Sequence, residues 1–126
     1  KPFGKPLSIN QAIQFPLAEL HTRCEMLRAL IHKTAWQMDK YGNFKVSDKV
    51  SMCNYQASRL CCEAADQAMQ VHGGLGYSRH KPFEHIYRHH RRYRITEGAE
   101  EIQIRRIAGY MFGFMKQQAP KGVIED

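Results

Sequence analysis

The chain has 126 residues, the length of one domain, and it contains no run of about 18 apolar residues that would form a transmembrane helix. Hydrophobic residues make up 43% and charged residues 25% of the sequence, a balance that favours a folded globular protein and excludes a disordered one. The net charge of +7 permits attraction to nucleic acid, to an anionic membrane or to a phosphate-bearing cofactor, without choosing among them.

The first predicted helix runs from about Ser8 to Tyr41. Ser8 and Gln11 have the spacing of a capping box, and Gly42 with Asn43 supplies a stop. Between these ends, apolar residues recur every three or four positions, which is typical of the buried stripe of a bundle helix. The stripe consists of Ile13, Leu17, Leu20, Cys24, Leu27, Ile31, Ala35 and Met38.

The second predicted helix runs from Ser47, as its N-cap, to Val71. Its stripe is rich in small residues, which allow a neighbouring helix to approach closely. The stripe consists of Val50, Cys53, Ala57, Leu60, Ala64, Ala68 and Val71. The glycine-rich run at 73–76 ends this helix, and the short connection at 42–43 makes the first two helices antiparallel neighbours.

A short third helix is predicted to begin at Pro82, and a fourth follows Gly98 and reaches about Gln117. The fourth is expected to bury four apolar side chains, namely those of Ile102, Ile107, Met111 and Phe114. No alternation of period two appears, so no sheet is expected. The sequence predicts one all-α domain over 1–126, an antiparallel up-and-down arrangement like a four-helix bundle, with two long and two shorter helices.

Glu97 stands beside Gly98 at the junction of the last two predicted helices. An acidic residue there is explained by the dipole of the helix that follows, or it is a general base. A carboxylate in an apolar pocket has a raised pKa and can hold a proton during turnover. Gly98 would let a bulky substrate pass close to that carboxylate.

The glycines at 73, 74 and 76 also have two explanations. They form a helix C-cap and a tight turn, or they let the backbone approach a ligand closely, with Gln70 one turn earlier as a hydrogen-bonding group. The cluster follows a helix and not a strand, which argues against the dinucleotide-binding fingerprint.

The stretch from Arg79 to Arg94 holds six Lys and Arg residues against one Glu. His85 and His89 have the i, i+4 spacing of a metal-ligand pair, but no third ligand is apparent, so no metal site is expected. The stretch is instead a solvated face, a subunit contact or a polyanion site. The four cysteines form no CxxC pair, which favours buried thiols in a reducing compartment.

Taken together and in this order, these segments resemble the C-terminal helical domain of the acyl-CoA dehydrogenase family, over nearly the whole chain. The resemblance rests on Phe-Gly-Lys-Pro-Leu at 3–7, Gln-x-x-Gly-Gly-x-Gly at 70–76 and Glu-Gly-x-x-Glu-Ile-Gln at 97–103. Ala35-Trp36, Asp39 and Tyr87-Arg88 lie between these motifs. The sequence departs from the family at Ala99, where many members carry Thr.

The resemblance implies that an FAD-dependent enzyme dehydrogenates an acyl-CoA thioester. Glu97 would remove the α-proton as hydride leaves the β-carbon, and Gly98 would adjoin the bound thioester. The family's FAD lies between subunits, which implies that residues of this domain face its ADP half and its flavin side. The residues implied to contact FAD are Asn10, Gln11, Gln70, Val71, His72, Gly73, Gly74, Ala99 and Glu101.

The same resemblance implies an electron-accepting flavoprotein as partner, a homodimer or homotetramer, no membrane association, and a place in the cytoplasm, or in the mitochondrial matrix of a eukaryote. The chain lacks a starting Met, so it is expected to be a piece of a longer protein. The resemblance implies that this protein also has an N-terminal helical and a middle β domain, and that this piece alone is inactive. An alternative from another class is a basic module of a dehydrogenase relative that binds DNA. Glu97 argues against it, because such a module needs no base there, and nucleic acid is not the expected partner.

Overall fold

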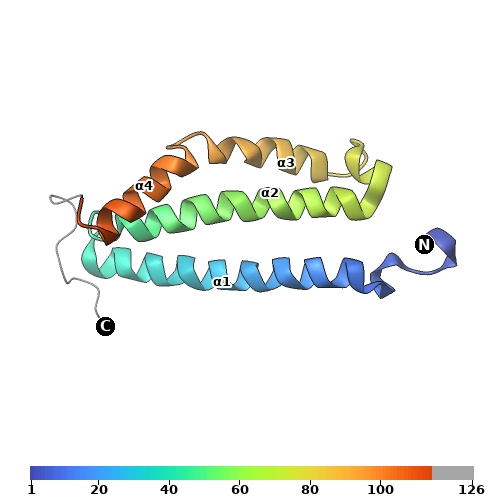
Figure 1. Cartoon of the computed structure of the whole chain (residues 1–126), viewed down its shortest axis with the longest axis horizontal. Helices are drawn as coiled ribbons and strands as arrows, with labels where there is room; N and C mark the ends of the chain where they lie inside the picture. The colour runs from blue at the N-terminus through green and yellow to red at the C-terminus, as the bar shows by residue number, and fades with distance from the viewer. Residues whose placement is uncertain (115–126) are drawn as a thin grey trace.

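The computed structural model describes residues 1–114, and all regular structure within that range is helical (Figure 1). The elements in chain order are η1 Pro2–Gly4, η2 Leu7–Ile9, α1 Gln11–Tyr41, α2 Ser47–Tyr77, α3 Phe83–Arg91, η3 Arg92–Arg94 and α4 Glu100–Met111. The prediction of an all-α arrangement with two long and two shorter helices is therefore confirmed. None of the helices in the described range is long and apolar enough to cross a membrane.

α2 is the central helix of the domain. α1 packs antiparallel along one side of it, and α3 and α4 follow one another along the other side (Figure 1). Because α2 is covered from two sides, the best-buried apolar residues gather on it or at its start. These residues are Val46, Leu60, Cys62 and Ala65.

The face of α1 that meets α2 differs from the predicted stripe. Its buried and half-buried residues alternate at spacings of three and four from Ile13 to Tyr41, and they include the polar Arg23, Thr34 and Gln37. Arg23 pairs with Glu63 across the two helices. The prediction was wrong for the stripe positions Leu17, Cys24, Ile31, Ala35 and Met38, which are all exposed.

Four of those exposed residues form a second row on α1, which we call the outer row. It consists of Leu17, Cys24, Ile31 and Met38, each seven residues from the next. A seven-residue repeat of apolar side chains is the pattern of a helix that packs against another helix. None of the described residues buries the outer row. The predicted stripe therefore mixed two faces of α1, one for α2 and one that lies uncovered.

Both predicted N-caps were wrong. Asn10, not Ser8, is the N-cap of α1, since its φ of −86° and ψ of 128° are extended and its O accepts from Gln14 N at 3.0 Å. Asn10 Nδ2 donates to Leu7 O at 3.1 Å and helps to hold the short turn η2 in front of the helix. Ser47 is the first residue of α2 rather than its N-cap. Its hydroxyl lies 2.6 Å from the hydroxyl of Tyr110, which also donates to Phe44 O at 2.8 Å and thereby fixes the end of α4 to the start of α2.

The far ends of two helices also differ from the prediction. α2 runs to Tyr77 rather than Val71, with one interruption at Gly73, whose φ of 60° and ψ of −144° are not helical. α4 ends at Met111 rather than near Gln117, and Gly113 follows with φ of 73°. Residues 115–117 of the predicted helix lie outside the described range.

The predicted buried side of α4 was also wrong. Ile102, Met111 and Phe114 are exposed, and Ile107 is half-buried. The buried residues are instead Glu100, Gln103 and Gly109. Two of these carry polar side chains, so a reading based on apolar residues alone could not find the face that meets α2.

Candidate functional site

The turn between η3 and α4 holds Glu97 in an unusual backbone conformation. Glu97 has a φ of 58°, in the left-handed region that residues with a Cβ rarely adopt, and Gly98 follows with a φ of 92°. Holding a non-glycine residue there costs on the order of 1 kcal/mol or more, so the surrounding structure must determine the conformation.

Gln103 supplies part of that support. Its Nε2 donates to the carbonyl oxygens of Glu97 at 3.1 Å and Gly98 at 3.4 Å, and its side chain is buried. A Cβ at position 98 would lie 2.9 Å from the same nitrogen. Position 98 thus requires glycine for its backbone angle and for the close approach of Gln103.

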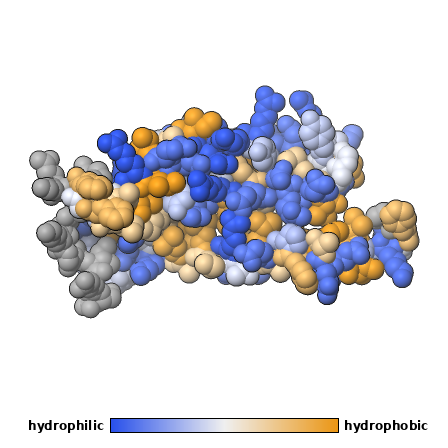
Figure 2. Space-filling view, in the orientation of Figure 1, coloured by the Kyte–Doolittle hydropathy of each residue, from blue (hydrophilic) through white to orange (hydrophobic). Residues whose placement is uncertain are grey.

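The side chain of Glu97 is exposed in this turn. No side chain among residues 1–114 pairs with it. Two apolar side chains of the same region, Ile95 and Ile102, are 63% and 49% exposed. Hydrophobic surface is visible where α3 gives way to α4 (Figure 2). The turn therefore presents a carboxylate beside apolar surface that the described residues do not cover.

Glu100, the first residue of α4, is buried and accepts four hydrogen bonds. Arg94 donates from Nε and Nη2 at 2.8 and 2.9 Å, and Arg59 of α2 donates from Nε and Nη2, both at 3.1 Å. Two bidentate pairs on one carboxylate fix its position and orientation. We call Arg59, Arg94 and Glu100 the arginine clamp.

The arginine clamp lowers the pKa of Glu100 from 4.5 to about 2, chiefly through the hydrogen bonds from Arg94 and Arg59. A carboxyl whose pKa is depressed in the folded state stabilises the protein above its unfolded pKa and loses that contribution as the pH falls toward the folded pKa.

We therefore expect Glu100→Gln to destabilise the protein more at pH 6 than at pH 3. The Glu100 carboxylate loses part of its stabilising contribution between these pH values, whereas the amide of the variant does not titrate. The difference in unfolding free energy between the two proteins should shrink by about 2 kcal/mol. Urea unfolding at both pH values measures it. A difference that stays constant would show that the charge of Glu100 does not stabilise the fold.

The second group of predicted site residues lies where α1 begins and α2 ends. Asn10 and Gln11 stand at the start of α1, and Figure 1 shows this end of α1 beside the end of α2 that carries 70–76. Asn10, Gln11 and Gln70 are exposed and Val71 is half-buried. Polar side chains from two helices thus lie exposed at the same end of the domain.

His72 is fixed locally in this group. Its Nδ1 lies 2.8 Å from Ala68 O, and its ring lies 4.6 Å from that of Phe83, measured between centroids. The imidazole therefore braces the end of α2 against the start of α3.

The three glycines of this group serve different purposes. Gly73 has a backbone conformation open only to glycine. Gly76 is buried, and a Cβ there would lie 2.6 Å from Met69 O and 2.7 Å from His72 Cβ. Gly74 has neither constraint, because its φ is not positive and a Cβ would meet nothing within 4 Å among the described residues. The fold of this chain therefore does not explain the glycine at 74.

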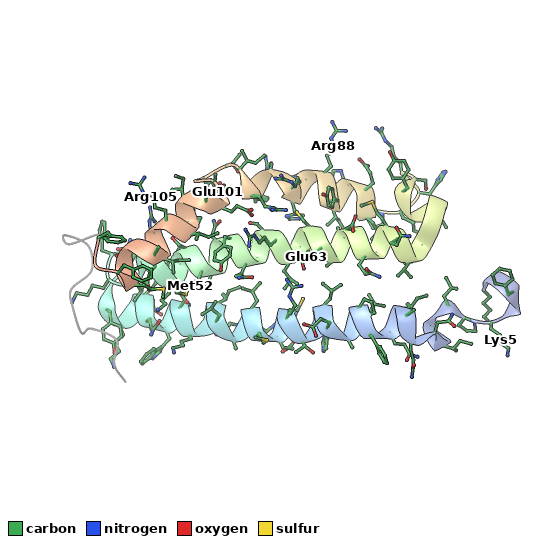
Figure 3. The ribbon with its side chains drawn as sticks, in the orientation of Figure 1. Lys5, Met52, Glu63, Arg88, Glu101 and Arg105 are labelled. Atoms are coloured by element: carbon green, nitrogen blue, oxygen red, sulfur yellow. The ribbon has the colours of Figure 1, made fainter. Side chains whose placement is uncertain are left out.

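The structure does not bring the two groups of predicted site residues together. Ala99 and Glu101 stand with Glu97 and Gly98 at the start of α4, and Figure 3 shows Glu101 at this junction. The start of α3 adjoins the other group, and α3 with η3 leads from there to the turn, over roughly 20 Å of helix. Any one ligand that touched both groups would have to be long.

Several residues of the basic stretch line an open cavity on the surface. An open cavity of about 700 Å³ is lined by Arg79, His80, Lys81, Pro82, Glu84, His85 and Arg88. Figure 3 shows Arg88 pointing away from α2. No group of three or more His, Cys, Asp or Glu side chains suited to a metal ion occurs in the part of the chain that the structure describes.

Sequence reasoning missed the residues that hold the turn. It did not single out Glu100 or Arg59, and it counted Arg94 only within the basic stretch. The one available signal was an arginine six residues before an acidic first turn. Arg59 lies 41 positions from Glu100, so only the packing of α4 on α2 reveals it.

The sequence and the fold both match known proteins. The family model described as acyl-CoA dehydrogenase, C-terminal domain, matches residues 1–112. A probable acyl-CoA dehydrogenase of Mycobacterium tuberculosis is 36% identical over 84% of this chain and 26% of its own length. A subunit of a caffeyl-CoA reductase–Etf complex of Acetobacterium woodii is 35% identical over 88% of this chain and 29% of its own length.

A solved structure shares the fold. The crystal structure of an acyl-CoA dehydrogenase from Slackia heliotrinireducens superimposes with a TM-score of 0.74 at 23% identity, over 88% of this chain and 29% of that one. The chain thus spans between a quarter and a third of the length of these proteins. Because the family model matches residues 1–112, the chain belongs to the acyl-CoA dehydrogenase family and corresponds to the C-terminal domain of its members.

Proposed function

We propose that this chain is the C-terminal domain of an FAD-dependent acyl-CoA dehydrogenase and that Glu97 is its catalytic base. The observation that carries the proposal is the conformation of the turn: a strained backbone holds a carboxylate that pairs with no side chain of residues 1–114, beside exposed apolar surface. Glu100 and Glu101 already supply negative charge to the first turn of α4. The need for such a charge therefore does not explain the strained conformation of Glu97.

In this proposal Glu97 takes the α-proton of the acyl thioester. Gly98 lets the thioester lie against the backbone, and Ile95 and Ile102 help to exclude water when the rest of the protein covers them. FAD supplies the hydride acceptor when bound.

The exposed glycine and amide groups at the end of α2 fit the ADP half of FAD. Gly74 offers backbone that a ligand can approach, and the side chains of Gln70, Asn10 and Gln11 are exposed hydrogen-bonding groups at the same end. Val71, His72 and Gly73 belong to the same segment, whereas Ala99 and Glu101 lie beside Glu97 and would face the flavin side. The separation of the groups fits a cofactor that lies between subunits, since each group would then contact a different FAD.

Gly74→Ala tests this assignment. We expect the folded protein to keep its melting temperature in the absence of FAD, because the new methyl group meets nothing within 4 Å. We expect FAD to bind about tenfold or more weakly, because the methyl group would displace the ligand from the backbone. Equilibrium dialysis measures the affinity for FAD. Gly42 is a glycine of positive φ remote from the site, and Gly42→Ala is the control. Unchanged affinity would remove Gly74 from the cofactor site.

The outer row of α1 supports assembly with further helices. Its apolar side chains are exposed at seven-residue intervals, and Phe15, Met26 and Trp36 are exposed on the same helix. Exposed apolar surface of this extent marks a contact with another chain or domain. We propose a homodimer or homotetramer, in which this domain contributes to the subunit interface and is inactive by itself.

We propose acyl-CoA as substrate and an electron-transferring flavoprotein as acceptor. The relative from Acetobacterium woodii is named as part of a complex with Etf, which supports an acceptor of that kind. Cys24, Cys53, Cys61 and Cys62 are all free thiols, which fits a reducing compartment such as the cytoplasm or the mitochondrial matrix.

Anaerobic titration of the full-length protein that carries this chain tests the proposed function. Addition of saturated acyl-CoA thioesters of several lengths should bleach the oxidised flavin spectrum and yield the corresponding enoyl-CoA. A protein that binds FAD but is not reduced by any of these thioesters would contradict dehydrogenation.

A further inference from the structure

The arginine clamp lies on both sides of the turn that carries Glu97. Arg94 is the last residue of η3 and Glu100 is the first residue of α4, so the ion pair between them closes the chain on either side of residues 95–99. Backbone bonds tighten each end: Ile95 N donates to Arg92 O at 2.8 Å, and Ile102 N donates to Ala99 O at 2.8 Å. The turn is thus a short loop with fixed ends.

Arg59 attaches this loop to the central helix. It donates two hydrogen bonds to the same carboxylate from α2, and its guanidinium lies 5.3 Å from the centre of the Tyr55 ring. The side chain of Glu100 is 9% exposed, whereas those of Arg59 and Arg94 are 38% and 29% exposed. The carboxylate is therefore the buried centre at which η3, α4 and α2 meet.

Gln103 is the third attachment. It holds the carbonyl groups of Glu97 and Gly98 from the next turn of α4. A shift of Glu100 would carry the start of α4 with it and would move Gln103 relative to both carbonyls. The orientation of the Glu97 backbone thus depends on the arginine clamp through α4.

We propose that Arg59 and Arg94, acting through Glu100, are positioning residues that fix the Glu97 carboxylate for proton removal. This inference rests on the proposed function of Glu97. None of the three contacts the substrate in this account; they determine where the carboxylate of Glu97 lies. A displacement of about 1 Å in a reacting group lowers a rate by as much as 10²-fold, so precise attachment of the turn matters for catalysis.

Lysine cannot replace these arginines fully. The guanidinium makes two parallel hydrogen bonds to one carboxylate, whereas an ammonium group acts as a point charge and fixes no orientation. Arg94→Lys would keep the charge and lose the bidentate geometry. It therefore separates the positioning effect from the effect of charge.

The test compares Glu100→Gln and Arg94→Lys with Glu97→Gln in the full-length protein. Glu63→Gln is the matched control, because it neutralises the carboxylate of another Arg–Glu pair, which lies between α1 and α2 (Figure 3). Rapid mixing with acyl-CoA gives the rate of flavin reduction and the affinity separately. Hydrogen exchange at the amides of 95–99 reports the mobility of the turn.

We expect Glu100→Gln to slow flavin reduction ten- to a hundredfold, with acyl-CoA affinity changed less than threefold and faster exchange at 95–99. Arg94→Lys should give a smaller effect in the same direction, and Glu63→Gln none. If Glu100→Gln fails to fold, Arg94→Lys carries the test alone. Wild-type reduction rates in the clamp variants, alongside a slow Glu97→Gln, would overturn the positioning role.

Failure of the proposed function gives a different result. In that case the flavin of Glu97→Gln would be reduced by acyl-CoA at the wild-type rate. Exchange at 95–99 would then decide the remaining structural claim: faster exchange in Glu100→Gln supports attachment of the turn by the clamp, and unchanged exchange overturns it.

Discussion

Glu97→Gln in the full-length protein that carries this chain is expected to slow the reduction of flavin by acyl-CoA by about three orders of magnitude. A positioned general base contributes roughly 10²–10⁴-fold to a rate, and an amide cannot accept the α-proton. FAD should remain bound at wild-type stoichiometry, because the Glu97 side chain is exposed and pairs with no other side chain in the range 1–114. Anaerobic stopped-flow measurement of the flavin absorbance gives the rate directly.

A control carboxylate separates this effect from a change of surface charge. Glu25 is exposed on α1, where it pairs with Arg28 three residues later. Glu25→Gln alters the charge by the same amount as Glu97→Gln and should leave the reduction rate unchanged. Equal rates for Glu97→Gln and the unsubstituted protein would place the base elsewhere and would leave the strain at Glu97 without a function.

Gly76→Ala is expected to have the largest effect on stability among the glycine substitutions. A Cβ at 76 would lie 2.6 Å from Met69 O and 3.0 Å from Met69 Cα, which are backbone atoms that cannot move without disturbing α2. Overpacking of this kind costs roughly 1–3 kcal/mol, and backbone contacts favour the upper end of that range. The melting temperature should fall by about 10 °C.

Thermal unfolding followed by circular dichroism checks this expectation. Gly74→Ala is the matched control, because it adds the same methyl group two residues away into open space. Similar melting temperatures for the two variants would contradict the account in which the glycines of one cluster have separate purposes.

The long helices were predictable because their apolar and polar residues follow the helical period over many turns. The stop at Gly42 holds, since its φ of 84° and the bond from its N to Met38 O close α1 where the sequence indicated. The face of α1 was not predictable from apolar residues alone. The contact with α2 includes Arg23, Thr34 and Gln37, which are the residue types that such a pattern discards.

The motifs of the candidate site were predictable from the sequence, whereas the residues that hold the turn in place were not. Glu97, Gly98 and the glycine run were singled out because they interrupt the helical pattern. The positive φ at Glu97 could not be predicted from the sequence, because glutamate is not a residue that indicates a left-handed turn. The link from Glu100 to Arg59 joins α4 to α2, so it depends on tertiary packing that no local pattern encodes.

We propose that the turn before α4 presents the Glu97 carboxylate to the α-carbon of a bound acyl thioester. An acyl-CoA whose β-carbon bears no hydrogen isolates that step, because hydride transfer is then impossible and only exchange of the α-protons remains. Proton NMR in D₂O follows the α-CH₂ signal in the presence of the full-length protein. The signal should decay with the unsubstituted protein and persist with Glu97→Gln, whereas equal decay with both proteins would show that Glu97 does not remove the α-proton.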